Sequence, residues 1–127
     1  MASVLLVDSQ TEICAEFSQT LRKHGVQVET ASTTEEVLCL LGRSEFEAVV
    51  LEFNLRSEQK NRAFSGAALE IIRRIRAGNE RTFILVFTSM EGEIYEKASL
   101  AAGADGFLLK KDGVTNLLSR LGAHLDK

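Results

Sequence analysis

Hydrophobic runs of four to six residues alternate with amphipathic stretches along the whole chain of 127 residues. Four runs are almost continuously apolar, which suits strands buried on both faces of a sheet, and the second run alternates like a half-exposed strand. In order, they are "SVLLV" (3–7), "VQVETA" (26–31), "FEAVVL" (46–51), "TFILVF" (82–87) and "GFLL" (106–109). The pattern therefore predicts five short strands.

The stretches after these runs carry apolar residues at helical spacing. The first helix has Ile13, Phe17 and Leu21 on one face. We expect Ser9 to cap its start, since Ser9 to Glu12 has the capping-box form, and Gly25 to close its end. The other helices are predicted from Thr33/Thr34 onward, over 66–76, over 91–102, and from Val114 to Leu125.

Five strand–helix units imply an α/β protein with a parallel sheet and helices on both faces. Ligands of such sheets bind at the carboxyl ends of the strands. Polar residues stand at four of these ends: Asp8-Ser9, Glu52-Phe53-Asn54, Thr88-Ser89 and Lys110-Lys111. Their clustering predicts a functional site at this edge of the sheet.

Composition places the chain among single globular domains, and we expect one domain over 1–127, which could belong to a longer signalling protein. The apolar runs are too short to cross a bilayer, and no signal peptide is apparent, so we expect a cytoplasmic location. The net charge is −3 without a basic stretch, which disfavours nucleic acid as a partner of this domain. Arg73, Arg74 and Arg76 are predicted to form the solvated face of their helix.

Two cysteines, Cys14 and Cys39, fall in predicted helices and lack metal-ligand spacing. We expect two reduced, packed thiols. The spacing leaves a disulfide between them open.

The residues at the strand ends follow one pattern, with "VLLVDS", "VLEFNLR", "LVFTS" and "GADGFLLKK" in that order. This pattern resembles the receiver domains of response regulators, which are CheY-like, and the resemblance covers essentially all of the chain. It implies a doubly wound, flavodoxin-like (βα)5 fold with strand order 2-1-3-4-5. It also implies a bacterial-type role in two-component phosphorelay signalling, without enzyme activity, through protein partners that bind the face of the fourth helix, fifth strand and fifth helix.

The chain departs from the family at the pocket. Glu52 occupies the position of the phosphoacceptor aspartate, and Ser9 replaces the second acid of the first strand's acidic pair. Arg56 and Lys111 stand where the family has proline, and the chain contains no proline. Because a non-proline cis bond costs about 2.5–4 kcal/mol, we expect a trans peptide before Lys111 and an altered loop into the last helix.

Other family positions are kept. Thr88 and Phe107 match the switch pair, and Lys110 matches the pocket lysine. The resemblance implies a Mg²⁺ site on Asp8, Glu52 and the carbonyl of Asn54. With Ser9 neutral we expect this site to be weak or lost, and we expect no cofactor.

Three interpretations of Glu52 follow. It could accept a phosphoryl group, although the extra methylene would displace the attacking oxygen by roughly 1.5 Å. Its charge could imitate the phosphorylated state, close to Thr88 and Lys110. It could also simply pair with Lys110, which needs an anion nearby. Asp8 likewise could bind metal or pair with Lys110.

The polar segment 56–65 is longer than the corresponding turn of the family. It could be a solvated insertion, or it could fold over the pocket with Phe64 as an anchor.

The leading hypothesis is therefore an atypical receiver, a pseudo-receiver, that acts by protein–protein contact with Glu52 in place of the acceptor. The alternative is a weakly phosphorylatable, Mg²⁺-dependent receiver that uses Glu52. A nucleotide-binding flavodoxin-like protein is disfavoured because no glycine-rich loop follows the first strand.

Overall fold

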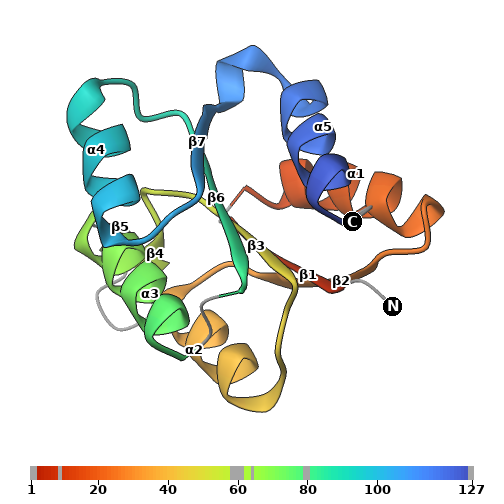
Figure 1. The fold of residues 1–127 in the computed structure, drawn as a ribbon, viewed down its shortest axis with the longest axis horizontal. Coiled ribbons are helices and arrows are strands. Elements are labelled where there is room, and N and C mark those ends of the chain that lie inside the picture. Colours follow the sequence, from red (N-terminus) through yellow and green to blue (C-terminus); the bar gives the residue numbers. More distant parts are fainter. Residues whose placement is uncertain (1–2, 9, 58–61, 64, 79–80, 126–127) are drawn as a thin grey trace.

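The structure is a computed structural model that describes residues 3–8, 10–57, 62–63, 65–78 and 81–125. Its elements form three layers, with one parallel sheet between two layers of helices (Figure 1). The strands of this sheet are β1 (Ser3–Val7), β2 (Gln27–Ala31), β3 (Ala48–Leu51), β6 (Phe83–Thr88) and β7 (Gly106–Leu109). The helices are α1 (Thr11–Lys23), α2 (Thr34–Arg43), α3 (Ser65–Gly78), α4 (Glu93–Ala102) and α5 (Val114–Leu125).

The sheet has the order β2-β1-β3-β6-β7, and every neighbouring pair is parallel. Because β6 and β7 are its fourth and fifth strands along the chain, the expected order 2-1-3-4-5 is confirmed. The predicted apolar runs match these strands to within two residues, and the first and last match at both ends.

Side chains on the two faces of the sheet form two separate cores. Leu5 and Val7 of β1 belong to the core under α2, α3 and α4. Val4 and Leu6 belong to the core under α1 and α5. Alternate residues of one strand thus serve opposite layers, which explains why the central strands are apolar throughout.

Helix ends follow the expected chemistry in two places and differ in one. After α1, Gly25 has φ +80°, and hydrogen bonds from Gly25 N–H to Arg22 O and from Val26 N–H to Leu21 O form a Schellman motif. At the start of α2, the Thr33 hydroxyl accepts the Glu36 N–H at 3.3 Å. The expectation that Ser9 caps α1 is wrong, because Gln10 holds the N-cap position; Ser9 itself lies outside the described residues.

The segment 56–65 carries two short antiparallel strands, β4 (Arg56–Ser57) and β5 (Arg62–Ala63), and β4 contacts α2. The sequence pattern does not reveal them, because two residues are too few for any periodicity. Phe64, the proposed anchor, lies outside the described residues.

Arg76 corrects a second expectation, since it is not part of a solvated face. Its guanidinium donates to the carbonyls of Gly103 and Thr82 and forms a 2.8 Å ion pair with Asp105. The same Asp105 oxygen accepts the Ile84 N–H at 2.8 Å. Arg76 therefore joins α3 to the turn between α4 and β7.

Within the described residues, no helix combines the length and the apolar character needed to cross a membrane.

Two glycines allow a matched test of these helix ends. Gly25→Ala is expected to lower the free energy of unfolding by about 1 kcal/mol, because an alanine at positive φ is strained. Gly42→Ala, inside α2 with open space where the added Cβ would lie, is expected to raise it by about 0.5 kcal/mol. Urea unfolding of the two variants checks both signs, and a stabilised Gly25→Ala variant would contradict the assigned conformation.

Candidate functional site

The candidate site lies where the carboxyl ends of three parallel strands meet. Asp8 follows β1, Glu52 follows β3, and Lys110 follows β7. Parallel pairing places all three residues at the same edge of the sheet (Figure 1). The structure thus brings together three of the residues that the sequence singled out.

Lys110 holds the site together. Its Nζ lies 2.6 Å from Asp8 Oδ2, 2.9 Å from Glu52 Oε1 and 2.6 Å from Gln10 Oε1. An ammonium group has three N–H donors, so these three acceptors use all of them. We call Asp8, Gln10, Glu52 and Lys110 the Lys110 cluster.

Backbone amides bind the other carboxylate oxygens of the cluster. Asp8 Oδ1 accepts the Gln10 N–H at 2.9 Å, and Glu52 Oε2 accepts the Asn54 N–H at 3.1 Å. The side chains of Lys110, Asp8 and Glu52 are only 11%, 8% and 8% exposed. Both carboxylates are therefore fixed at each oxygen and largely shielded from water.

These contacts set the charge of the cluster. Burial alone would lower the pKa of Lys110, but hydrogen bonds to Asp8 and Glu52, and the charges of both, outweigh it and raise this pKa above its ordinary value. The lysine therefore stays cationic throughout the physiological range. Its contribution to stability is complete below the unfolded-state pKa of about 10.4 and is lost as the pH rises through the higher folded-state value.

The donor set fits an ammonium ion better than Mg²⁺. Magnesium requires octahedral oxygen ligands at short distances, whereas the two carboxylates here already contact Lys110 and backbone amides. Among the described residues, no three His, Cys, Asp or Glu side chains converge on a common point. Ser9 lies outside the described part. The third ligand that the resemblance implies is the carbonyl of Asn54, and the N–H of the same residue already donates to Glu52 Oε2 at 3.1 Å. We therefore derive no chemical step through a metal ion.

Thr88 and Phe107 lie on one face of the sheet, since Thr88 is opposite Leu109 and Phe107 is opposite Val86. Thr88 is fully buried, and its hydroxyl accepts the Met90 N–H at 3.1 Å. Phe107 is partly buried against the core below α2, α3 and α4. In the part of the chain described here, no hydrogen bond joins Thr88 to the Lys110 cluster, so its hydroxyl serves the loop after β6.

Lys111 takes no part in the cluster. The peptide before it is trans, as expected, and it belongs to a 3-10 turn, η1 (Lys110–Asp112), that leads into α5. Its ammonium pairs with the exposed Glu91. This pair is a surface contact between the loops after β7 and β6.

The sequence reasoning missed two contributors to the site. The sequence does not single out Gln10, because a neutral amide two residues beyond a strand end carries no signal of its own, although its amide oxygen is the third acceptor for Lys110. Phe53 stands in the strand-end segment Glu52-Phe53-Asn54, but the sequence gives it no role. It is 2% exposed and meets Tyr95 of α4 edge to face, with 5.3 Å between ring centroids. The residue after Glu52 thus contacts α4 directly.

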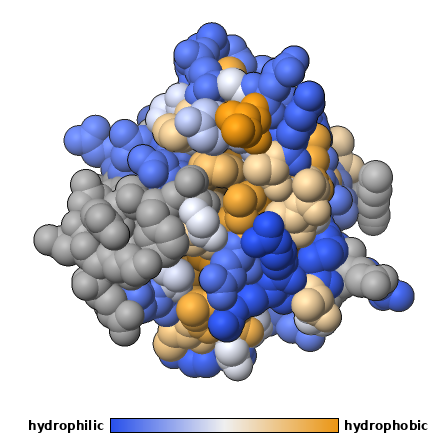
Figure 2. Space-filling model, turned by 90° about the vertical axis from the view of Figure 1, so that its left-hand side faces the viewer, coloured by the Kyte–Doolittle hydropathy of each residue, from blue (hydrophilic) through white to orange (hydrophobic). Residues whose placement is uncertain are grey.

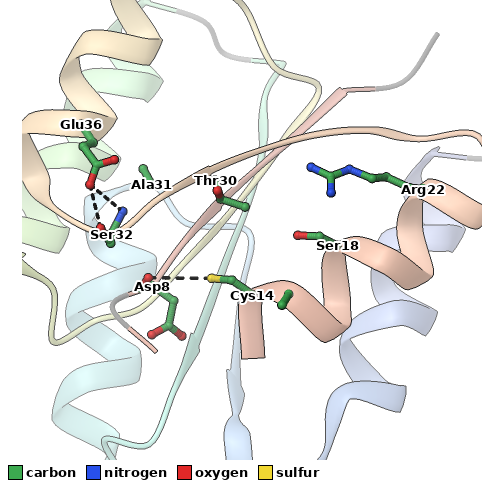
Figure 3. Close-up of a pocket in the computed structure, with 9 residues that line it drawn as sticks. Asp8, Cys14, Ser18, Arg22, Thr30, Ala31, Ser32 and Glu36 are labelled. Atoms are coloured by element: carbon green, nitrogen blue, oxygen red, sulfur yellow. Dashed lines mark hydrogen bonds between the residues drawn. The ribbon is translucent and has the colours of Figure 1, made fainter. Parts of the chain in front are cut away.

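Cys14 borders the site from α1. Its Sγ lies 3.8 Å from the Asp8 carbonyl oxygen (Figure 3). Burial, followed by the charge of Asp8 and partly offset by Lys110, raises the pKa of this thiol to about 11. Both cysteines are free thiols, and Cys39 is exposed rather than packed as expected.

Comparisons with known proteins agree with this architecture. Residues 4–122 match the family model described as "Response regulator receiver domain". The chain is 30% identical over 122 residues to the response regulator MprA of Mycobacterium sp. (strain KMS), a match that covers 96% of this chain and 50% of that protein. The chain therefore spans about half the length of the curated relatives it matches.

Two solved structures show the same fold. The BeF3-activated receiver domain of DrrB from Thermotoga maritima has a TM-score of 0.83 and 25% identity, with 100% of this chain and 99% of that one covered. The chemotaxis response regulator CheY4 of Vibrio cholerae has a TM-score of 0.81 and 28% identity, with 98% of each chain covered.

The Lys110 cluster can be tested by deleting its cation. Lys110→Met is expected to lower the free energy of unfolding by about 3 kcal/mol, because it leaves two buried carboxylates without their cation. The double variant Lys110→Met/Glu52→Met should recover part of this loss, since both members of one pair become apolar. The surface variant Lys111→Met should unfold like the unmodified protein in the same denaturant series, and equal losses at 110 and 111 would contradict the geometry.

The two thiols should differ sharply in reactivity. At pH 8, three units below a pKa of about 11, roughly one Cys14 thiol in a thousand is ionised, and it is also buried. Alkylation followed by peptide mass spectrometry is expected to modify Cys39 within minutes and Cys14 only in denaturant. Equal labelling of both residues in the folded protein would disprove this difference.

Proposed function

The chain belongs to the response regulator receiver domain family of two-component signalling, and from this premise we propose that it is a pseudo-receiver that signals through protein contacts without aspartyl phosphorylation. The observation that carries the proposal is the Lys110 ammonium between Asp8 and Glu52, 2.6 and 2.9 Å from their oxygens. In the family this pocket holds Mg²⁺ and a phosphoaspartate. Here a permanent internal cation faces a permanent carboxylate.

Phosphoryl transfer would need these groups to be available. In-line transfer depends on positioning and on cations that neutralise the phosphoryl oxygens. All three N–H groups of the Lys110 ammonium donate within the cluster, and each Glu52 oxygen already accepts a hydrogen bond. Glutamate also carries its oxygens one methylene further than aspartate, and a misplacement of about 1 Å can cost roughly 100-fold in rate. These effects together oppose acceptance of a phosphoryl group.

A fixed charge pair in place of a transient phosphoryl group favours one conformation of the domain. The contact between Phe53 and Tyr95 offers a direct connection from the loop after Glu52 to α4. In this proposal, the position of the loop after Glu52 affects the position of α4 through this contact, and the partner protein binds at α4.

The proposed partner surface is the face formed by α4, β7 and α5. On α4, Ile94 is 73% and Leu100 43% exposed, and these are the exposed large hydrophobic side chains of the described residues. Figure 2 shows apolar surface on the side of the molecule that carries α4. Burial of these two side chains against a partner would remove apolar surface from water, which favours association.

Backbone NMR titration with Mg²⁺, followed by beryllium fluoride as a phosphoryl mimic, tests the proposal. We expect no saturable shifts of the Asp8, Glu52 and Thr88 amides, because the carboxylates are already bound. Saturable shifts at these three amides would instead support the alternative function, a Mg²⁺-dependent receiver weakly phosphorylated on Glu52.

A double variant, Glu52→Asp with Ser9→Asp, supplies the positive control. It restores the acid pair and the shorter acceptor, so we expect it to bind Mg²⁺ and to become phosphorylated by acetyl phosphate. If it does neither, the backbone of the pocket has also diverged, and side-chain replacement alone does not explain the proposed loss of phosphorylation.

A further inference from the structure

The outer edge of β2 carries backbone groups that lie outside the hydrogen-bonded ladder of the sheet. Among the described strands, β2 pairs with β1 alone, so it forms one edge of the sheet (Figure 1). The Ala31 carbonyl accepts the Asp8 N–H at 3.0 Å, so the backbone groups of Ala31 face β1. Successive residues of a strand turn their backbone groups to opposite sides, and those of Val28 and Thr30 therefore face away from the sheet.

One side chain protects part of this edge. Arg22 of α1 donates to the Val28 carbonyl at 3.0 Å, as expected for a carbonyl on the outer side. Thr30 is exposed, and no described residue binds its N–H or its carbonyl. Open edges are templates for pairing with another strand, and charged side chains commonly protect them. Arg22 thus covers one end of the β2 edge and leaves the other end open.

Open space lies beside β2 along its whole length. A groove with a volume of about 690 Å³ is lined by residues 27–29 of the strand. A cavity of about 280 Å³ beside α1 is lined by residues 30–31, which follow in the same strand (Figure 3). Arg22 lines both, so the two hollows meet at its side chain. An added strand, which would lie about 4.8 Å from β2, can therefore approach this edge without displacing any described helix or strand.

The side chains of β2 determine what kind of strand can bind. Val28 packs against the core under α1 and α5, so Glu29 points to the opposite face of the sheet, and Glu45 lines the same groove. If two copies of β2 paired in antiparallel register over their full length, the two Glu29 side chains would lie opposite each other. Like charges at such a position are destabilising. The edge therefore disfavours a second copy of this chain and favours a strand that places a cation beside Glu29.

We propose that the outer edge of β2 binds an extended segment of a partner protein in which lysine or arginine alternates with β-branched residues. The backbone of this segment would pair with the outward groups of Val28 and Thr30, with Arg22 releasing the Val28 carbonyl. Its basic side chains would lie beside Glu29, and its β-branched side chains would pack beside Val28 and Thr30. This surface is separate from the face of α4, β7 and α5, and the proposal holds whether or not Glu52 accepts a phosphoryl group.

Amide NMR titration of the full chain with a blocked hexapeptide that alternates lysine with valine tests the proposal. Saturable shifts are expected at Val28, Glu29 and Thr30, with a Kd of about 1 mM. Two N-methylated versions of the peptide, one methylated at the lysines and one at the valines, provide matched controls. Only one of these two sets of N–H groups can face β2, so one version should lose binding and the other should keep it. Silence toward the unmodified peptide, shifts confined to other residues, or equal behaviour of the two methylated versions would overturn the proposal.

Variants of the protein locate the contact by charge and by hydrogen bonding. Glu29→Gln is expected to weaken peptide binding about threefold, because it removes the charge beside the lysines. Arg22→Met is expected to tighten binding about threefold, because the Val28 carbonyl no longer has to be released from the guanidinium. Arg73→Met on α3 and Glu96→Gln on α4 alter exposed side chains away from β2 and should bind like the unmodified protein (Figure 1).

Two kinds of result would contradict this assignment. An Arg22→Met variant that binds more weakly, or a Glu29→Gln variant that binds normally, would refute the contacts given to these side chains. Concentration-dependent shifts of the Val28 and Thr30 amides in the absence of peptide would show that a second copy of the chain occupies the edge, and would overturn the choice of partner.

Discussion

The ammonium group of Lys110 is the interaction on which the carboxyl edge of the sheet depends. It joins the tips of β1, β3 and β7 by direct contacts to Asp8 and Glu52, and it also holds Gln10 at the start of α1. Two carboxylates so close together and so little exposed would repel one another in its absence. The strand order places β6 between β3 and β7, so the lysine reaches across β6 to Glu52 and Asp8, which follow strands that do not pair with β7. One side chain thus connects three strand ends that the topology of the sheet brings together.

The energetic value of this arrangement lies more in geometry than in net stability. Buried ion pairs pay a desolvation cost that roughly offsets their attraction, and apolar replacements are often as stable. What the cluster supplies is a unique position for each of its groups, because all three ammonium donors and each carboxylate oxygen have a specific partner. The desolvation of charged groups is confined to the carboxyl ends of the strands. The two apolar cores on either side of the sheet supply the hydrophobic burial that stabilises the fold.

How far the sequence predicts this structure depends on whether a feature is encoded by neighbouring residues or by residues far apart in the chain. Strands such as Ser3–Val7 and caps such as Thr33 are encoded by neighbouring residues, and the pattern predicts them well. The pairing of Lys110 with Glu52 was also predictable, because parallel strands bring their ends together and a buried-looking lysine requires an anion. Arg76 could not be assigned in this way, since its acceptors at Thr82, Gly103 and Asp105 belong to turns whose positions only the folded chain defines. Gln10 was missed for a related reason: a neutral amide becomes informative only once the lysine's third donor is seen to need an acceptor.

A built-in cation has a consequence for how such a domain can be regulated. Shifting a two-state equilibrium from 1:99 to 99:1 requires about a 10⁴-fold difference in affinity between the states, and a phosphoryl group with its metal supplies that difference in a switchable way. Lys110 and Glu52 are always present, so they shift the equilibrium between the two conformations of the domain by a constant amount. Under the proposed function they therefore favour one conformation permanently and cannot switch the domain between the two. Any variable input must then act through another part of the molecule. Asp8 belongs to the Lys110 cluster and also borders the cavity beside α1, where its carbonyl contacts Cys14. The tip of β1 is thus held from two sides, by the lysine at the Asp8 carboxylate and by α1 at the Asp8 carbonyl.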